Sequence, residues 1–305
     1  MQLKGLFTAL ITPFIEDELD EEGLRHLIRR QCAAGVTGIV LLGTTGETPT
    51  LSEEEQKRII QIGVEEAKQK TLLIIGTGSN STHTTLKKTV QAQELGADAA
   101  LIVTPYYNKP TQEGIYQHYH TIATQTDLPL IVYNIQGRTG VNIETNTLLK
   151  IAGLPHVVGV KECSGNFNQV ADVIETICSK YPDFSVLSGD DGLALPMIAL
   201  GATGLISVVS NLIPEEMIAL VEASLAERIT DARKIHEQLL PLFRLAFIET
   251  NPMPIKYAMT LQGLPAGSCR LPLCHLRKEN QEKLRCLFKN YQGTVSEVDY
   301  APRLL

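Results

Sequence analysis

Residues 157–165 read VVGVKECSG, an apolar run that stops at Lys161 and is followed by a carboxylate, a thiol, a hydroxyl and a glycine. A short Val-rich run is typical of a β-strand, and the lack of alternation is typical of a strand buried on both faces in a parallel sheet. An ammonium group at the end of such a strand loses hydration, which lowers its pKa from the ordinary value of about 10.4. The free amine is then a nucleophile that attacks a ketone to form a Schiff base.

Seven other runs of this kind occur along the chain. They are GLFTALIT from Gly5, GIVLLGTTG from Gly38, LLIIGTG from Leu72, AALIVTPYY from Ala99, LPLIVYN from Leu128, FSVLSGDD from Phe184 and GLISVVSN from Gly204. Helical periodicity fills most of the gaps, over about 21–34, 82–95, 112–125, 166–181 and 190–200. Another helix begins at Ser52, which has the spacing of a capping box with Glu55.

Eight strand and helix units predict an α/β protein with a (β/α)₈ TIM barrel. An open doubly wound sheet, which commonly has about five or six strands, is the alternative. Only helical patterns follow the eighth strand, from about Pro214 to Asn290, and the last residues show no periodicity. We therefore predict a catalytic barrel over residues 1–224, a C-terminal helical domain over 225–290 and a tail over 291–305.

Composition narrows the possible partners. The net charge is −7, which argues against a nucleic-acid partner. No apolar stretch approaches the roughly 18 residues that a membrane helix needs, and the N-terminus lacks a secretory pattern, so we expect a cytoplasmic protein without membrane contact.

Cysteine and histidine spacing speaks against a metal site. The six cysteines include no CxxC pair, which predicts reduced, mostly buried thiols. His118 and His120 are two positions apart on a predicted helix and point to different sides, so we expect a solvated helix face there.

Polar side chains gather where the predicted strands end, which is the face of a barrel that carries active sites. The loop at 43–47, GTTGE, offers hydroxyl and N–H groups to a carboxylate or phosphate. Tyr107 and Tyr133 are candidates for proton transfer, and the planar guanidinium of Arg138 is suited to bind a carboxylate with two hydrogen bonds. Each of these residues also has an ordinary structural interpretation. Considered by itself, Lys161 is also consistent with a side chain that extends to solvent or forms an ion pair with Glu162.

Five motifs together carry a family resemblance: GTTGE at 43–47, PYYNKP at 105–110, YNIQGRTG at 133–140, GVKECSG at 159–165 and SGDD at 188–191. In their order and spacing, and in NPMPIKYA at 251–258 and RLPL at 270–273, the chain resembles the dihydrodipicolinate synthase and N-acetylneuraminate lyase superfamily over about residues 3–290. The resemblance implies a barrel with a C-terminal helical domain. It also implies an enzyme that condenses pyruvate with an aldehyde through a lysine Schiff base, without metal or organic cofactor.

The resemblance also implies catalytic roles. Lys161 takes the Schiff-base position, and Thr44, Tyr133 and Tyr107 match a proton-relay triad in which Tyr107 reaches into the neighbouring subunit's site. An active homodimer, usually within a homotetramer, follows from that shared triad.

Four further positions match substrate-binding residues of the family. Thr45 corresponds to the residue that holds the pyruvate carboxylate, and Gly189 and Ile206 line the pyruvate pocket. Arg138 matches the residue that binds the carboxylate of L-aspartate 4-semialdehyde, which favours the synthase branch in the diaminopimelate route to lysine. The alternatives are a sister aldolase acting on a 2-keto-3-deoxy sugar acid or N-acetylneuraminate, and a non-catalytic paralogue that binds a keto acid.

The chain departs from the family pattern at a few positions. Gln136 stands where the family commonly has Pro, which removes a rigid φ near Arg138. Asn80 and Tyr106 match lysine-site positions, whereas Gln56 and Thr84 replace a histidine and an acidic residue. We therefore predict weak or absent inhibition by lysine, which a sub-millimolar inhibition constant in a steady-state assay would contradict.

Overall fold

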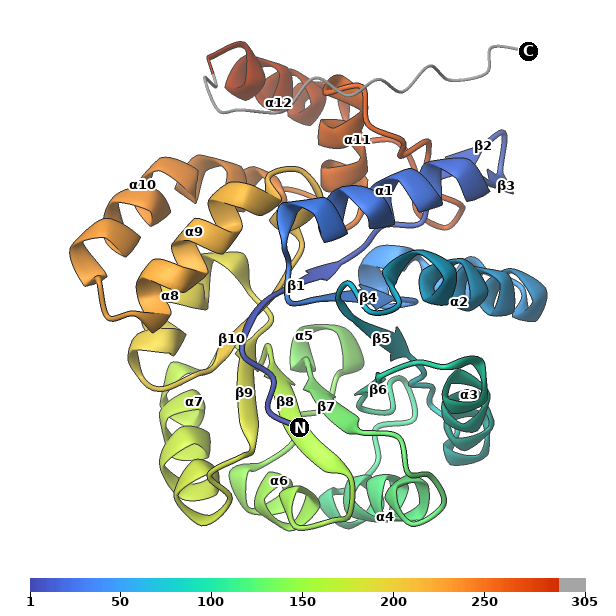
Figure 1. The fold of residues 1–305 in the computed structure, drawn as a ribbon, viewed down its shortest axis with the longest axis vertical. Helices are drawn as coiled ribbons and strands as arrows, with labels where there is room; N and C mark the ends of the chain where they lie inside the picture. Colours follow the sequence, from blue (N-terminus) through green and yellow to red (C-terminus); the bar gives the residue numbers. More distant parts are fainter. Residues whose placement is uncertain (291–305) are drawn as a thin grey trace.

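Eight parallel strands close into a barrel in the order β1-β10-β9-β8-β7-β6-β5-β4, with β4 paired back to β1 (Figure 1). In the computed structural model, which describes residues 1–290, these strands are β1 (Gly5–Ala9), β4 (Gly38–Leu41), β5 (Leu72–Gly76), β6 (Ala99–Val103), β7 (Leu130–Asn134), β8 (Val157–Glu162), β9 (Ser185–Ser188) and β10 (Gly204–Ser207). All eight apolar runs thus form strands. The predicted TIM barrel is confirmed, and the doubly wound alternative is wrong.

Helices surround the barrel on its outside (Figure 1). They are α1 (Glu21–Ala34), α2 (Glu53–Ala67), α3 (Thr82–Leu95), α4 (Gln112–Ala123), α6 (Thr145–Ala152), α7 (Phe167–Val173), α8 (Ala194–Ala199) and α9 (Pro214–Leu225). The capping box at Ser52 and Glu55 is present at the start of α2.

Two helical predictions need correction, and one helix was not predicted. The helix expected over 166–181 is α7 followed by a π-helical stretch, Ile174–Cys178. The one expected over 190–200 begins as a 3₁₀ turn at Asp191 before α8. The sequence pattern also missed α6, which has only two turns.

Three further helices follow the barrel in the sequence: α10 (Ile229–Leu245), α11 (Met253–Leu261) and α12 (Lys278–Asn290). Helix α10 lies alongside α9, and α11 and α12 lie at the top of the view in Figure 1. A short hairpin, β2 (Phe14–Ile15) with β3 (Glu18–Leu19), lies near α1 and was not predicted. A division after residue 224 stays a prediction, and the predicted tail, 291–305, lies outside the described residues.

The strands bury side chains on both faces. Val40 belongs to the apolar cluster inside the barrel, whereas its neighbours Ile39 and Leu41 belong to the cluster between strands and helices. This double burial explains why the strands read as unbroken apolar runs. Within residues 1–290, no helix combines the length and apolar character that crossing a membrane requires.

Two predictions about the burial of cysteine and histidine side chains are partly wrong. The six cysteines are free, but four are half-buried and Cys274 and Cys286 are exposed. His118 is buried in α4 rather than solvated, with Nδ1 3.0 Å from Thr82 Oγ1, and burial lowers its pKa to about 4. No group of three or more His, Cys, Asp or Glu suited to a metal occurs among the described residues.

Candidate active site

Lys161 lies on β8, opposite Tyr133 of β7 in the parallel register. Its side chain is 6% exposed, and Nζ lies 4.4 Å from the centroid of the Tyr133 ring. Within the described part of the chain, no acceptor hydrogen-bonds or pairs with this nitrogen. Burial lowers the pKa of Lys161, and the charge of Arg138 lowers it further, while Cys163 and Asp191 act in the opposite direction. A buried amine without a partner is available for chemistry.

Gly189, directly after β9, packs against this lysine. A Cβ atom at Gly189 would lie 1.9 Å from Cys163 Sγ and 2.6 Å from Lys161 Cε, so no larger residue fits without moving one of them. Burial raises the pKa of the Cys163 thiol to about 12, which keeps it protonated. Cys163 therefore does not compete with Lys161 as a nucleophile.

The GTTGE loop brings two hydroxyls to the same place. After β4 the chain turns through a 3₁₀ helix, Thr44–Gly46, and Thr45 is buried. Burial raises the pKa of Tyr133 well above its usual range, while the charge of Arg138 and the nearby Thr44 hydroxyl act in the opposite direction. Tyr133 therefore stays protonated at neutral pH and is able to donate a proton.

An ion pair that sequence reasoning missed anchors this loop. Glu47 has a φ of 55°, and its carboxylate accepts a hydrogen bond of 2.8 Å from Lys256 Nζ in α11. Its other oxygen accepts the backbone N–H of Arg270 at 2.9 Å. The C-terminal helical part thus fixes the end of the loop that carries Thr44.

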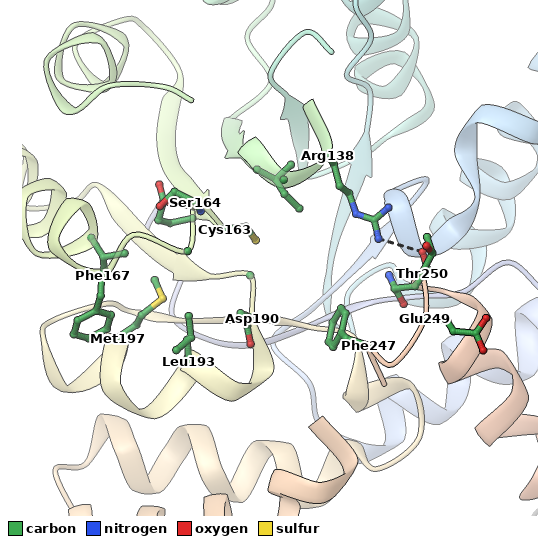
Figure 2. A pocket seen from close by; sticks show the side chains of 17 residues that line it. Arg138, Cys163, Ser164, Phe167, Asp190, Leu193, Met197, Phe247, Glu249 and Thr250 are labelled. Atoms are coloured by element: carbon green, nitrogen blue, oxygen red, sulfur yellow. Dashed lines mark hydrogen bonds between the residues drawn. The ribbon is translucent and has the colours of Figure 1, made fainter. Parts of the chain in front are cut away.

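Arg138 lies in α5 (Gln136–Thr139), the short helix after β7. Gln136 is the first residue of α5, a position where proline is tolerated because its N–H has no helical partner, so glutamine changes no helical hydrogen bond here. Arg138 Nη2 donates to the backbone carbonyl of Asn251 at 3.2 Å, the dashed line in Figure 2.

Asn251 is a second residue that sequence reasoning missed. Its Nδ2 donates to Thr45 Oγ1 at 3.0 Å, so it connects the two predicted carboxylate-binding residues, Thr45 and Arg138. The only sequence signal was its place at the head of the motif NPMPIKYA.

Three hollows meet at Arg138 and Asn251, which line all of them. The smallest, of about 50 Å³, is also lined by Lys161, Tyr133 and Gly189, together with Thr44 and Thr45. A hollow of about 440 Å³ lies on the side of Cys163, Asp190 and Phe247 (Figure 2). One of about 370 Å³ lies on the side of Tyr106 and Thr48.

Two predicted site residues lie elsewhere. Tyr107 is 89% exposed with a φ of 73°, and it lines none of these three hollows. Ile206 is buried in the apolar cluster inside the barrel, and Val208, two residues further on, lines the small cavity instead. The other six predicted residues are brought together.

The chain is similar to known proteins over nearly its whole length. A sequence model of the dihydrodipicolinate synthetase family matches residues 2–291. The 4-hydroxy-tetrahydrodipicolinate synthase of Protochlamydia amoebophila is 56% identical over 285 residues, which are 93% of this chain and 95% of that protein. The protein of the same name from Syntrophus aciditrophicus is 46% identical over 94% of this chain and 98% of its own length.

Solved structures agree with this likeness. The dihydrodipicolinate synthase of Thermotoga maritima superposes with a TM-score of 0.93 at 42% identity, covering 95% of this chain and 98% of that one. The Aquifex aeolicus enzyme gives 0.91 at 44% identity, with coverage of 94% and 97%. With a family match across the barrel and its helical extension, the chain belongs to the dihydrodipicolinate synthetase family.

Proposed function

We propose that the chain is a 4-hydroxy-tetrahydrodipicolinate synthase, a class I aldolase-type lyase that condenses pyruvate with L-aspartate 4-semialdehyde in lysine biosynthesis. The observation that carries this proposal is the buried Lys161 amine, which has no acceptor in the described residues and lies against Tyr133. The sequence relatives of that name support the reaction.

The geometry supports a sequence of steps. The neutral Lys161 amine attacks the pyruvate ketone, water leaves, and the resulting imine lets the methyl group lose a proton. Tyr133 and Thr44 carry protons in these steps. The enamine carbon then attacks the aldehyde of the second substrate, whose carboxylate pairs with the planar fork of Arg138. Attack of that substrate's amino group on the imine carbon closes the ring and releases Lys161.

We place Tyr107 in the active site of a second copy. Its ring is 89% exposed, so its hydroxyl does not complete the site of its own chain. The protein then acts as a homodimer or as a homotetramer made of two dimers. One structural neighbour is described as a monomeric variant of dihydrodipicolinate synthase, so assembly needs a direct test in this chain.

Subunit complementation tests this placement. Tyr107→Phe alone should lower kcat by about 10²-fold or more, the size expected for a lost proton carrier. Mixed with Lys161→Met chains, it should regain activity, because one site per mixed dimer then combines Lys161 with Tyr107 from the other chain. No regain after refolding the mixture, or a monomer in sedimentation, would contradict the shared site.

The sister-aldolase alternative is separated by turnover. We expect consumption of L-aspartate 4-semialdehyde with pyruvate to exceed cleavage of 2-keto-3-deoxy sugar acids and N-acetylneuraminate, because Arg138 matches a second carboxylate rather than a polyhydroxyl chain. Faster sugar-acid cleavage would overturn the synthase proposal. The non-catalytic alternative is set aside, because relatives at up to 56% identity are synthases.

Two expectations from the sequence remain predictions: a cytoplasmic location and weak or absent inhibition by lysine. The Gln56 amide donates to the Leu51 carbonyl at 2.9 Å, so the side chain that replaces the family histidine is already bonded within its own segment. A steady-state assay with added lysine tests the second prediction.

A further inference from the structure

The Asn251 side chain has one polar atom in use and one unused. It is 4% exposed and lines all three hollows around Arg138. Its Nδ2 donates to Thr45 Oγ1, but Oδ1 is buried and has no hydrogen-bond partner among residues 1–290. Buried amide oxygens are almost always hydrogen-bonded, so an unpaired one at a ligand cavity points to a ligand donor.

The direction of the hydrogen bond to Thr45 fits the proposed function. A threonine that holds a carboxylate must donate its hydroxyl proton to that carboxylate. Thr45 Oγ1 is free to do so because it accepts from Asn251 Nδ2 at 3.0 Å. The same orientation leaves Oδ1 of Asn251 as an acceptor only, so it selects a ligand that donates.

The nearby charges suit a zwitterion. Arg138 donates to the Asn251 backbone carbonyl, and both residues line the same three hollows, so a carboxylate-binding guanidinium lies beside the residue that carries the free amide oxygen. Asp190 and Glu249, which carry carboxylates, line the hollow of about 440 Å³ that Arg138 and Asn251 also line (Figure 2). In an α-amino acid the ammonium and the carboxylate are attached to one carbon, so an acceptor beside the guanidinium meets the ammonium.

We propose that Asn251 is a specificity-determining residue whose Oδ1 accepts a hydrogen bond from the α-ammonium group of the second substrate. This inference rests on the proposed function. It adds to that function a way for the enzyme to distinguish L-aspartate 4-semialdehyde from an aldehyde that has the same carboxylate but no amino group. A site built to pair a donor rejects the analogue that lacks it, because the acceptor is then left buried and unpaired.

The test compares L-aspartate 4-semialdehyde with succinic semialdehyde, which has the same aldehyde and carboxylate but no amino group. In Asn251→Ala, the KM for L-aspartate 4-semialdehyde should rise about tenfold or more, while the inhibition constant of succinic semialdehyde, which has no donor for Oδ1, should fall or stay within about threefold of wild type. The backbone bond to Arg138 remains in this variant, so carboxylate binding is kept. Exposed Asn146→Ala serves as the matched control.

Asn251→Asp supplies the second arm. Its carboxylate keeps an acceptor for the ammonium but cannot donate to Thr45, whose hydroxyl then turns toward it. We expect the KM for pyruvate to rise about fivefold or more while the KM for L-aspartate 4-semialdehyde is nearly unchanged.

The outcomes separate the two levels of the proposal. If Asn251→Ala weakens the binding of L-aspartate 4-semialdehyde and of succinic semialdehyde equally, Asn251 has only a structural role. That result would overturn this inference but not the proposed function. A wild-type protein that forms the pyruvate adduct at Lys161 but does not consume L-aspartate 4-semialdehyde would overturn the proposed function, and the inference with it.

Discussion

Among the described residues two lysines, Lys161 and Lys256, are buried, and their surroundings differ. Lys256 is 1% exposed, and its Nζ donates to the Glu47 carboxylate at 2.8 Å and to the carbonyls of Thr12 and Ser268 at 3.0 and 2.9 Å. Lys161 is 6% exposed, and within the described residues its Nζ has no hydrogen-bond acceptor or ion-pair partner; the Tyr133 ring centroid lies 4.4 Å away.

The difference shows that burial alone does not make a lysine reactive. Burial is the main cause that lowers the pKa of both residues. In Lys256 the Glu47 carboxylate opposes that effect and all three N–H donors have acceptors, so the ammonium is retained as part of the structure. Lys161 has no such partner to stabilise its charged form, so its amine is available to attack a ketone.

The largest expected effect is on turnover. Lys161→Met should lower kcat by about 10⁴-fold or more, because no other buried amine of the site is free to form the imine. The folded state should be as stable as wild type or slightly more so. Steady-state assays and thermal unfolding measure both properties, and retention of more than a hundredth of the activity would contradict the role of Lys161.

The opposite pattern is expected at the second lysine. Lys256→Met should lower the free energy of unfolding by about 3 to 5 kcal/mol, because the Glu47 carboxylate is then buried without a counter-charge. Urea unfolding measures this change. The double variant Glu47→Gln with Lys256→Met should recover part of the loss, and equal stability of the Lys161 and Lys256 single variants would break the comparison.

A smaller effect tests how closely Lys161 is positioned. Gly189→Ala should lower kcat by about 10²-fold, because the added Cβ forces the Cys163 thiol or the Lys161 side chain to move. Gly137→Ala is the matched control, since a Cβ atom there has open space around it. An unchanged kcat in Gly189→Ala would show that the lysine does not depend on this contact.

The smallest effect concerns pH. The reactive form of Lys161 is the free amine, so the rate of imine formation should rise with pH and level off above the residue's pKa, which burial lowers below the ordinary 10.5. The charge of Arg138 contributes to this lowering, so Arg138→Gln should move the rising limb toward higher pH. The rate of borohydride trapping, measured as a function of pH, gives this rising part of the profile. A shift toward lower pH in Arg138→Gln would contradict the stated effect of the Arg138 charge on the pKa of Lys161.

Much of the fold could be predicted because its signals are local. The strands bury both faces, so each appears as an apolar run that ends in the residues of the site, as VVGVKE does before Cys163. The failures are also physical. The short helix α6 has too few turns for a clear period, and the π-helical stretch after α7 shifts the register that a 3.6-residue period assumes.

Long-range contacts set the limit for the site. Glu47 and Lys256 are 209 positions apart, and Thr45 and Asn251 are 206 apart, so no local pattern announces that these pairs meet. Tyr107 could be placed only by resemblance, because its proposed partner is in a second copy. Ile206 was predicted to line the pocket, but it packs in the apolar cluster inside the barrel, and Val208, just after β10, lines the cavity instead.

The contrast between the two lysines is tested most directly by sodium borohydride reduction in the presence of pyruvate, followed by peptide mass spectrometry. We predict one pyruvyl adduct per chain, on Lys161, and none on Lys256 or in the Lys161→Met variant. An adduct on Lys256, or its absence from Lys161 in the wild-type protein, would contradict the assignment.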